Sequence, residues 1–168
     1  LLLATMVLGV VSCMKEYSFE SSFGEETDVK LTVALPDVAT RSAGANSATG
    51  AIGNIDLDND YDIRYVLGVY DTNGTLIKGQ YENYEDKSTA TEFVLRLVPG
   101  RNYRFVVWAD FVKQGEKSSL HYNTADLKNI TRIGEASAMD ECMDAYFIQQ
   151  DIEVKATHTD ELVLTRPF

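Results

Sequence analysis

Two stretches decide the fold: Thr91-Glu-Phe-Val-Leu-Arg-Leu-Val98 and Asn102-Tyr-Arg-Phe-Val-Val-Trp-Ala-Asp-Phe111, separated by Pro99-Gly100-Arg101. Apolar side chains recur at every second position in both, which is typical of β-strands with one buried face. Pro-Gly is typical of a type II turn. The residues predicted to face the core are Phe93, Leu95, Leu97, Tyr103, Phe105, Val107 and Ala109. The sequence therefore predicts a tight β-hairpin over residues 91–111.

The same alternation continues on either side of this pair. It predicts a half-buried strand over 28–36 with Val29, Leu31, Val33 and Leu35 pointing inward. Further strands are predicted over 63–70, 75–81, 145–150, 152–156 and 161–165, with an Asn73-Gly74 hairpin turn after the first of these. Seven or eight strands with little helix indicate an all-β protein, an antiparallel β-sandwich in which 112–140 form a long irregular insertion.

Composition limits the classes of function that the chain is expected to have. A chain of 168 residues with 45% hydrophobic and 24% charged residues has enough apolar surface for one folded domain. The net charge of −11 argues against nucleic-acid binding, because no basic patch exists to neutralise phosphates. No nucleophile elbow and no glycine-rich phosphate loop occurs. We therefore expect neither an enzyme nor a cofactor.

Residues 1–13 suggest export. Twelve uncharged residues precede Cys13, which is too few for a membrane-spanning helix but matches the apolar core of a secretory signal. Val10-Val-Ser-Cys13 resembles a bacterial lipobox, in which the chain is cleaved before the cysteine and the cysteine is acylated. Residues 14–28, rich in Glu and Ser, are then a flexible tether, and 29–168 a domain on an outer-membrane lipid anchor. The alternative is a buried strand at the start of the domain.

Arg41 lies where the first predicted strand gives way to a loop. Residues 42–53 are almost entirely Ser, Ala, Gly, Asn and Thr, so they have little to bury and are predicted to be mobile. An arginine at the mouth of such a loop is accessible to a trypsin-like protease. Arg41 is thus either a processing site or an ordinary loop residue.

Several segments together resemble the fimbrillin-type surface lipoproteins of Bacteroides-like bacteria. They are the lipobox at Cys13, the strand-to-arginine segment 31–41, the segment Leu97-Val-Pro-Gly-Arg-Asn-Tyr-Arg-Phe-Val-Val-Trp-Ala-Asp110, Tyr122-Asn-Thr-Ala-Asp-Leu127 and the closing Leu162-Val-Leu-Thr-Arg-Pro-Phe168. The resemblance covers most of residues 29–168. It rests on the overall pattern, since no catalytic signature is involved.

This resemblance implies the first, transthyretin-like Greek-key domain of a two-domain type V pilus subunit. Such pilins are cut after an arginine and lose their first strand, and a neighbouring subunit donates a strand to the empty groove. Arg41 would match the cut, and residues 29–35 the strand removed. The implied partners are other fimbrial subunits, the outer-membrane lipid and the processing protease. Anchor and cap subunits of the family keep their lipid uncut, and the sequence leaves these roles open.

Acidic residues and histidines are the possible metal ligands in the sequence. Asp56, Asp58, Asp60 and Asp62 alternate as in a calcium loop, but Tyr61 stands where that loop needs Gly and Leu67 where it needs Glu. A weak surface calcium site and a solvated acidic segment are both consistent with this pattern. His121 and His158 have no His or Cys neighbour at zinc-ligand spacing. Cys142 is expected to be a small, semi-buried residue.

Aromatic residues supply a rival function. Trp108, Tyr81 and Tyr84 could form a platform for sugar rings, which would make the chain a glycan-binding lipoprotein of a polysaccharide-uptake system. In a sandwich, however, such residues more often pack in the core or at its rim. A solvent-facing Trp108 would favour the glycan binder, whereas a removable first strand would favour the fimbrial subunit.

Overall fold

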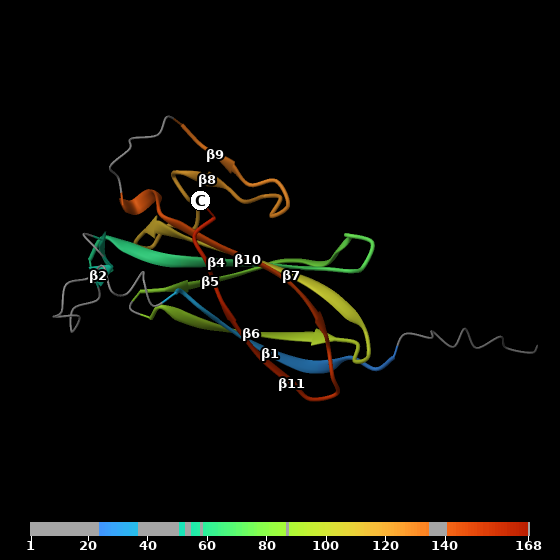
Figure 1. Cartoon of the computed structure of the whole chain (residues 1–168). Coiled ribbons are helices and arrows are strands. Elements are labelled where there is room, and N and C mark those ends of the chain that lie inside the picture. The colour runs from blue at the N-terminus through green and yellow to red at the C-terminus, as the bar shows by residue number, and fades with distance from the viewer. Residues whose placement is uncertain are drawn as a thin grey trace, which may run out of the picture.

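The structure is a computed structural model that describes residues 24–36, 51–52, 55–57, 59–86, 88–134 and 141–167. Seven long strands form two sheets that face each other (Figure 1). One sheet has the order β11-β1-β6 and the other β10-β7-β4-β5. The strands are β1 (Thr27–Ala34), β4 (Tyr61–Tyr70), β5 (Leu76–Glu85), β6 (Ala90–Leu97), β7 (Asn102–Lys113), β10 (Ala145–Glu153) and β11 (His158–Val163). The predicted all-β sandwich is confirmed.

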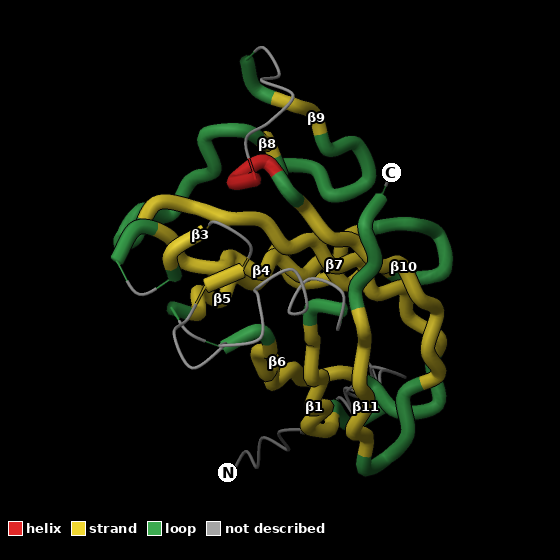
Figure 2. Tube along the Cα trace, turned by 60° about the vertical axis from the view of Figure 1, so that its left-hand side comes forward, coloured by secondary structure: helices red, strands yellow, loops and turns green. Residues whose placement is uncertain are grey.

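The remaining elements are short. β2 (Ala51–Ile52) pairs with β3 (Ile55–Asp56), and β8 (Tyr122–Asn123) pairs with β9 (Thr131–Arg132). A 3-10 turn, η1 (Glu141–Met143), precedes β10. β8 and β9 belong to the irregular insertion, and η1 follows it; all three lie on the side of the four-stranded sheet away from the three-stranded sheet (Figure 2). Within the described ranges, no helix is both long and apolar enough to cross a bilayer.

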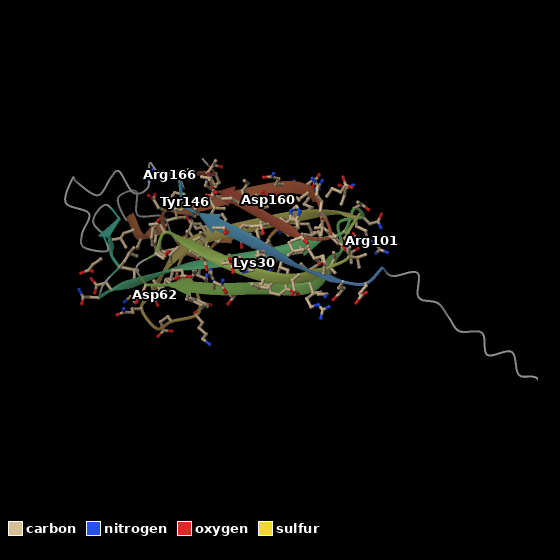
Figure 3. All side chains as sticks on the ribbon, turned by 90° about the horizontal axis from the view of Figure 1, so that it is seen from below. Lys30, Asp62, Arg101, Tyr146, Asp160 and Arg166 are labelled. Atoms are coloured by element: carbon tan, nitrogen blue, oxygen red, sulfur yellow. The ribbon has the colours of Figure 1, made fainter. Side chains whose placement is uncertain are left out.

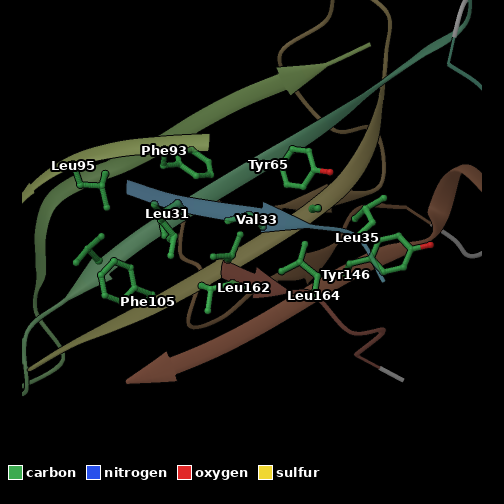
Figure 4. Close-up of a cluster of buried hydrophobic side chains, with 14 of the residues drawn as sticks. Leu31, Val33, Leu35, Tyr65, Phe93, Leu95, Phe105, Tyr146, Leu162 and Leu164 are labelled. Atoms are coloured by element: carbon green, nitrogen blue, oxygen red, sulfur yellow. The ribbon is translucent and has the colours of Figure 1, made fainter. Parts of the chain in front are cut away.

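The core lies between the two sheets and is built from the alternating positions (Figure 4). Leu31 of β1, Tyr65 of β4 and Phe105 of β7 are fully enclosed at 0% exposure. Because alternate side chains of a strand point to opposite faces, each of these strands offers every second residue to this core. The inward faces assigned from the sequence to residues 29–35 and 103–109 are confirmed.

The predicted hairpin over residues 91–111 is wrong. β6 pairs with β1 and β7 pairs with β4 and β10, so the two strands lie in opposite sheets. Pro99-Gly100, with Gly100 at φ +77°, carries the chain across the sandwich, and the Tyr103 hydroxyl hydrogen-bonds both backbone N and O of Val98. Two amphipathic strands can bury their apolar faces side by side or across a core, and alternation alone does not distinguish these arrangements.

The other predicted strands are present with shifted bounds, except that two of them are one strand and one pairing is parallel. The Asn73-Gly74 turn joins β4 and β5 as an antiparallel hairpin, and the Asp71 side chain accepts hydrogen bonds from the backbone N–H groups of Asn73 and Thr75. β5 continues to Glu85, four residues beyond the predicted end, and β10 is one strand where two were predicted. β1 begins at Thr27, inside the predicted tether. The pairing of β1 with β11 is parallel, unlike the antiparallel arrangement expected throughout.

Candidate functional site

β1 is the middle strand of its sheet and pairs on both sides. Thr27 to Ala34 align antiparallel with β6 from Leu97 to Ala90, and Val29 to Ala34 align parallel with β11. Two backbone hydrogen bonds continue the pairing at the end of β1. Leu35 N donates to Thr89 O, and Ala34 O accepts from Leu164 N. β1 therefore satisfies the backbone of two neighbours as well as its own.

The four predicted side chains of the removable strand all face the core. Val29, Leu31 and Val33 are 0% exposed and Leu35 is 5% exposed. Leu31 and Val33 lie between Phe93 of β6 and Leu162 of β11, above Phe105 of the opposite sheet (Figure 4). Burial of such side chains contributes about 1.5–3 kcal/mol each, or roughly 6–12 kcal/mol together. That equals a large share of a domain's usual stability of about 5–15 kcal/mol.

The opposite face of β1 is only partly covered, with Thr32 and Ala34 half-buried. Asp28 and Lys30 are exposed, and Lys30 makes a surface ion pair of 3.4 Å with Glu92 of β6. Lys30 is visible in the middle of this face in Figure 3. A peptide that replaced β1 would therefore need apolar side chains only at alternate positions.

The segment that follows β1 lies outside the described residues. This holds for Arg41, the predicted processing site, and for Cys13, the predicted lipidation site. The last described residues before the gap are Leu35 and Pro36. Both predictions stay predictions.

A second feature is a groove on the outer face of the four-stranded sheet, where the insertion covers it. The groove has a volume of about 530 Å³. Its apolar walls come from two strands, the insertion and the C-terminal segment: Trp108, Phe147, Tyr122, Leu127, Ile130 and Pro167. Lys128 and Arg132 complete the lining. The Tyr122 ring meets Trp108 edge-on, with centroids 4.9 Å apart.

The structure does not bring the three predicted glycan contacts together. Trp108 is 4% exposed and belongs to the outer cluster under the insertion, whereas Tyr81 packs against the core between the sheets. The Tyr84 hydroxyl donates to the Glu82 carboxylate and also lies 2.9 Å from Lys117 O. Burial, then this hydrogen bond, raises the pKa of Tyr84 to about 12. A flat three-ring platform is therefore not formed.

Aspartates of the acidic segment 56–62 hydrogen-bond other groups of the protein. The Asp56 carboxylate accepts hydrogen bonds from Asn59 N and Asn59 Nδ2, and Asp62 Oδ2 accepts one from Gly115 N. Asp58 lies outside the described residues. Within the part of the chain that the structure describes, no three His, Cys, Asp or Glu side chains are grouped to hold a metal ion.

Two polar contacts were missed at the sequence level. Arg64 and Asp110, opposite each other on β4 and β7, form a bidentate ion pair of 2.9 Å with side chains 4% and 0% exposed. His121 Nε2 lies 3.2 Å from Cys142 Sγ. The only sequence feature that indicated the Arg64–Asp110 pair was one positive and one negative residue within two apolar strands. The His121–Cys142 contact joins two irregular segments, and no sequence feature indicated it.

The sequence matches a known protein family. A family described as a "Family of unknown function (DUF6562)" matches residues 20–168. The chain belongs to DUF6562. No curated protein matches it.

One solved structure similar to this DUF6562 chain is the crystal structure of "putative polysaccharide binding proteins (DUF1812)" from Bacteroides thetaiotaomicron VPI-5482. The two are 16% identical with a TM-score of 0.44. The alignment covers 82% of the DUF6562 chain and 47% of the other, so this chain spans about half the length of that protein.

Proposed function

We propose that this DUF6562 chain is a structural or adhesive subunit of a cell-surface fimbria, exported as a lipoprotein through Cys13. Assembly follows cleavage after Arg41, release of β1 and insertion of a strand from a neighbouring subunit. The single observation that carries the proposal is the position of β1: central in its sheet, buried on one face, and followed by the segment that contains Arg41.

The energetics couple cleavage to assembly. Loss of β1 would expose the Phe93 and Leu162 side chains and leave facing edges of β6 and β11 unpaired. Unpaired backbone groups and an open apolar groove are the two features that strand addition satisfies, through backbone pairing and pockets for alternate side chains. A subunit without β1 is therefore stable only with a donor strand in place.

The test is limited digestion of the chain with an arginine-specific protease, followed by intact mass spectrometry and unheated gel electrophoresis. We expect one fast cut after Arg41 and a ladder of SDS-resistant oligomers. Arg41→Lys is the matched control, since it keeps the charge but blocks an arginine-specific enzyme. An excess of a synthetic peptide of residues 27–35 is expected to cap the groove and stop the ladder at monomers.

Two results would contradict the proposal. One is resistance at Arg41 under conditions that cut other exposed arginines such as Arg132. The other is a cut chain that stays monomeric with the β1 segment still bound. Either result would favour an uncut anchor subunit or the rival glycan binder.

The rival has one observation in its favour, the aromatic residues Trp108, Tyr122 and Phe147 along the outer groove. Against it, Trp108 is only 4% exposed, which leaves little of its ring for a sugar to stack on. Retention on insoluble polysaccharides that is lost in Tyr122→Ala, with the fold intact by circular dichroism, would support glycan binding. Equal retention of that variant, or no retention of the parent chain, would exclude glycan binding at the outer groove.

A further inference from the structure

The outer groove has a polar group that the fold leaves unsatisfied. Trp108 lines the groove, its indole Nε1 is buried, and this atom has no hydrogen-bond partner among the described residues. An indole N–H is a donor only, so it needs an acceptor. Burying a donor without an acceptor is unfavourable, and most buried polar groups in native structures have a hydrogen-bond partner. A bound molecule that offers an acceptor would remove this cost.

The charged groups of the groove have one sign. Lys128 and Arg132 line it, and no carboxylate or carboxamide side chain does so among the described residues. Lys128 Nζ donates to Gly74 O at 2.8 Å and lies 5.1 Å from the centre of the Tyr70 ring, which fixes its position beside the groove. Arg132 is exposed. Two cations with no acid between them are notable in a chain of net charge −11.

The walls between these donors are apolar. They come from Phe147 on β10, next to Trp108 in register, and from Leu127, Ile130 and Tyr122 of the insertion. Sugars present many hydroxyl groups, which need hydrogen-bond acceptors as well as donors. The side chains that line this groove offer few acceptors. Its volume of about 530 Å³ is within the range of roughly 300–1,000 Å³ that small-molecule sites occupy.

We infer that the groove binds an amphipathic carboxylate, a molecule with an apolar body and one anionic head. The body lies on Phe147 and Ile130, and the head is paired with Arg132 and Lys128. An acceptor on the ligand receives the indole N–H of Trp108. This site goes beyond the proposed fimbrial function and does not depend on it, because it lies on the sheet opposite β1.

The chain carries its own reporter for this test, since Trp108 is its single tryptophan. Dodecanoate, kept below its micelle concentration, is titrated into the full chain while the tryptophan emission is followed. We expect a saturable change in intensity or wavelength. Dodecanol, which has the same alkyl chain without the charge, is expected to bind clearly more weakly.

A matched pair of variants tests the charge. Arg132→Gln is expected to weaken dodecanoate binding about threefold to fivefold, the effect of one partly exposed ion pair of up to about 1 kcal/mol. Arg96→Gln, at an exposed arginine on β6 in the other sheet, removes the same charge and is expected to leave binding unchanged. Ile130→Arg, which fills the groove, is expected to abolish binding, with folding verified by circular dichroism.

Three outcomes would overturn the inference. The first is an emission that does not change with dodecanoate. The second is equal weakening by Arg132→Gln and Arg96→Gln, which would indicate only general charge attraction. The third is equal binding of dodecanol, which would indicate an apolar groove without anion recognition.

Discussion

Substituting Leu31 by alanine tests whether β1 carries as much stability as strand replacement requires. Leu31 is 0% exposed, stands opposite Phe93 on β6, and lies in a backbone that is paired on both sides. Leu→Ala substitutions in cores cost about 2–5 kcal/mol, and the cost is highest where the surroundings cannot close the cavity. Because two ladders hold β1 in place, we expect the upper half of that range.

The assay is urea unfolding followed by circular dichroism. With a slope of about 2 kcal/mol per molar urea, the midpoint of Leu31→Ala is expected to fall by roughly 1.8–2.5 M with the slope unchanged. Lys30→Ala is the control on the same strand: its ion pair with Glu92 is about half exposed, and such pairs contribute about 0–1 kcal/mol. A loss below about 1 kcal/mol for Leu31→Ala, similar to the control, would refute the argument that the empty groove must be refilled.

Three further predictions concern the four-stranded sheet. Arg64→Met leaves Asp110 buried without its partner and is expected to cost about 3–5 kcal/mol in urea unfolding, whereas Arg64→Met with Asp110→Leu recovers most of the loss. Gly68→Ala places a Cβ about 3.0 Å from the Leu127 side chain, so we expect a loss of about 1–3 kcal/mol and a lower melting temperature. Tyr84, whose folded-state pKa is about 12, stays protonated where the unfolded chain ionises near 10. Its contribution is complete below pH 10 and is lost as pH rises from about 10 to 12, and the resulting decline in unfolding free energy is expected to be smaller in Tyr84→Phe.

Alternation predicted the strands and their faces because it reports burial of each residue directly. Strand partners were not predictable in the same way, since pairing depends on which elements meet in space. Residues 91–98 and 102–111 are close in sequence and equally amphipathic, yet the turn at Gly100 sends them to different sheets. The contact of His121 with Cys142 was beyond sequence reasoning for the same reason.

One pattern in the sequence indicates the layer that covers the four-stranded sheet. The strand over 63–70 is apolar at almost every position, and the strand over 102–111 carries Val106 and Trp108 opposite its core face. Strands that are apolar on both sides are covered on both sides. This pattern predicts that a further layer lies over the four-stranded sheet, and residues 114–134 are the natural candidate. The outer groove follows from that layer.

The covering layer also bears on the proposed exchange of β1, one of the central strands. β4 and β7 are also central, but each is packed against the core on one face and against the outer cluster on the other. Removing either would disrupt both apolar clusters. β1 has one buried face and one partly covered face, so its removal opens the main core and leaves the outer cluster intact. A donor strand would then have to match a single row of pockets, whereas a replacement for β4 or β7 would have to fit an apolar cluster on each face.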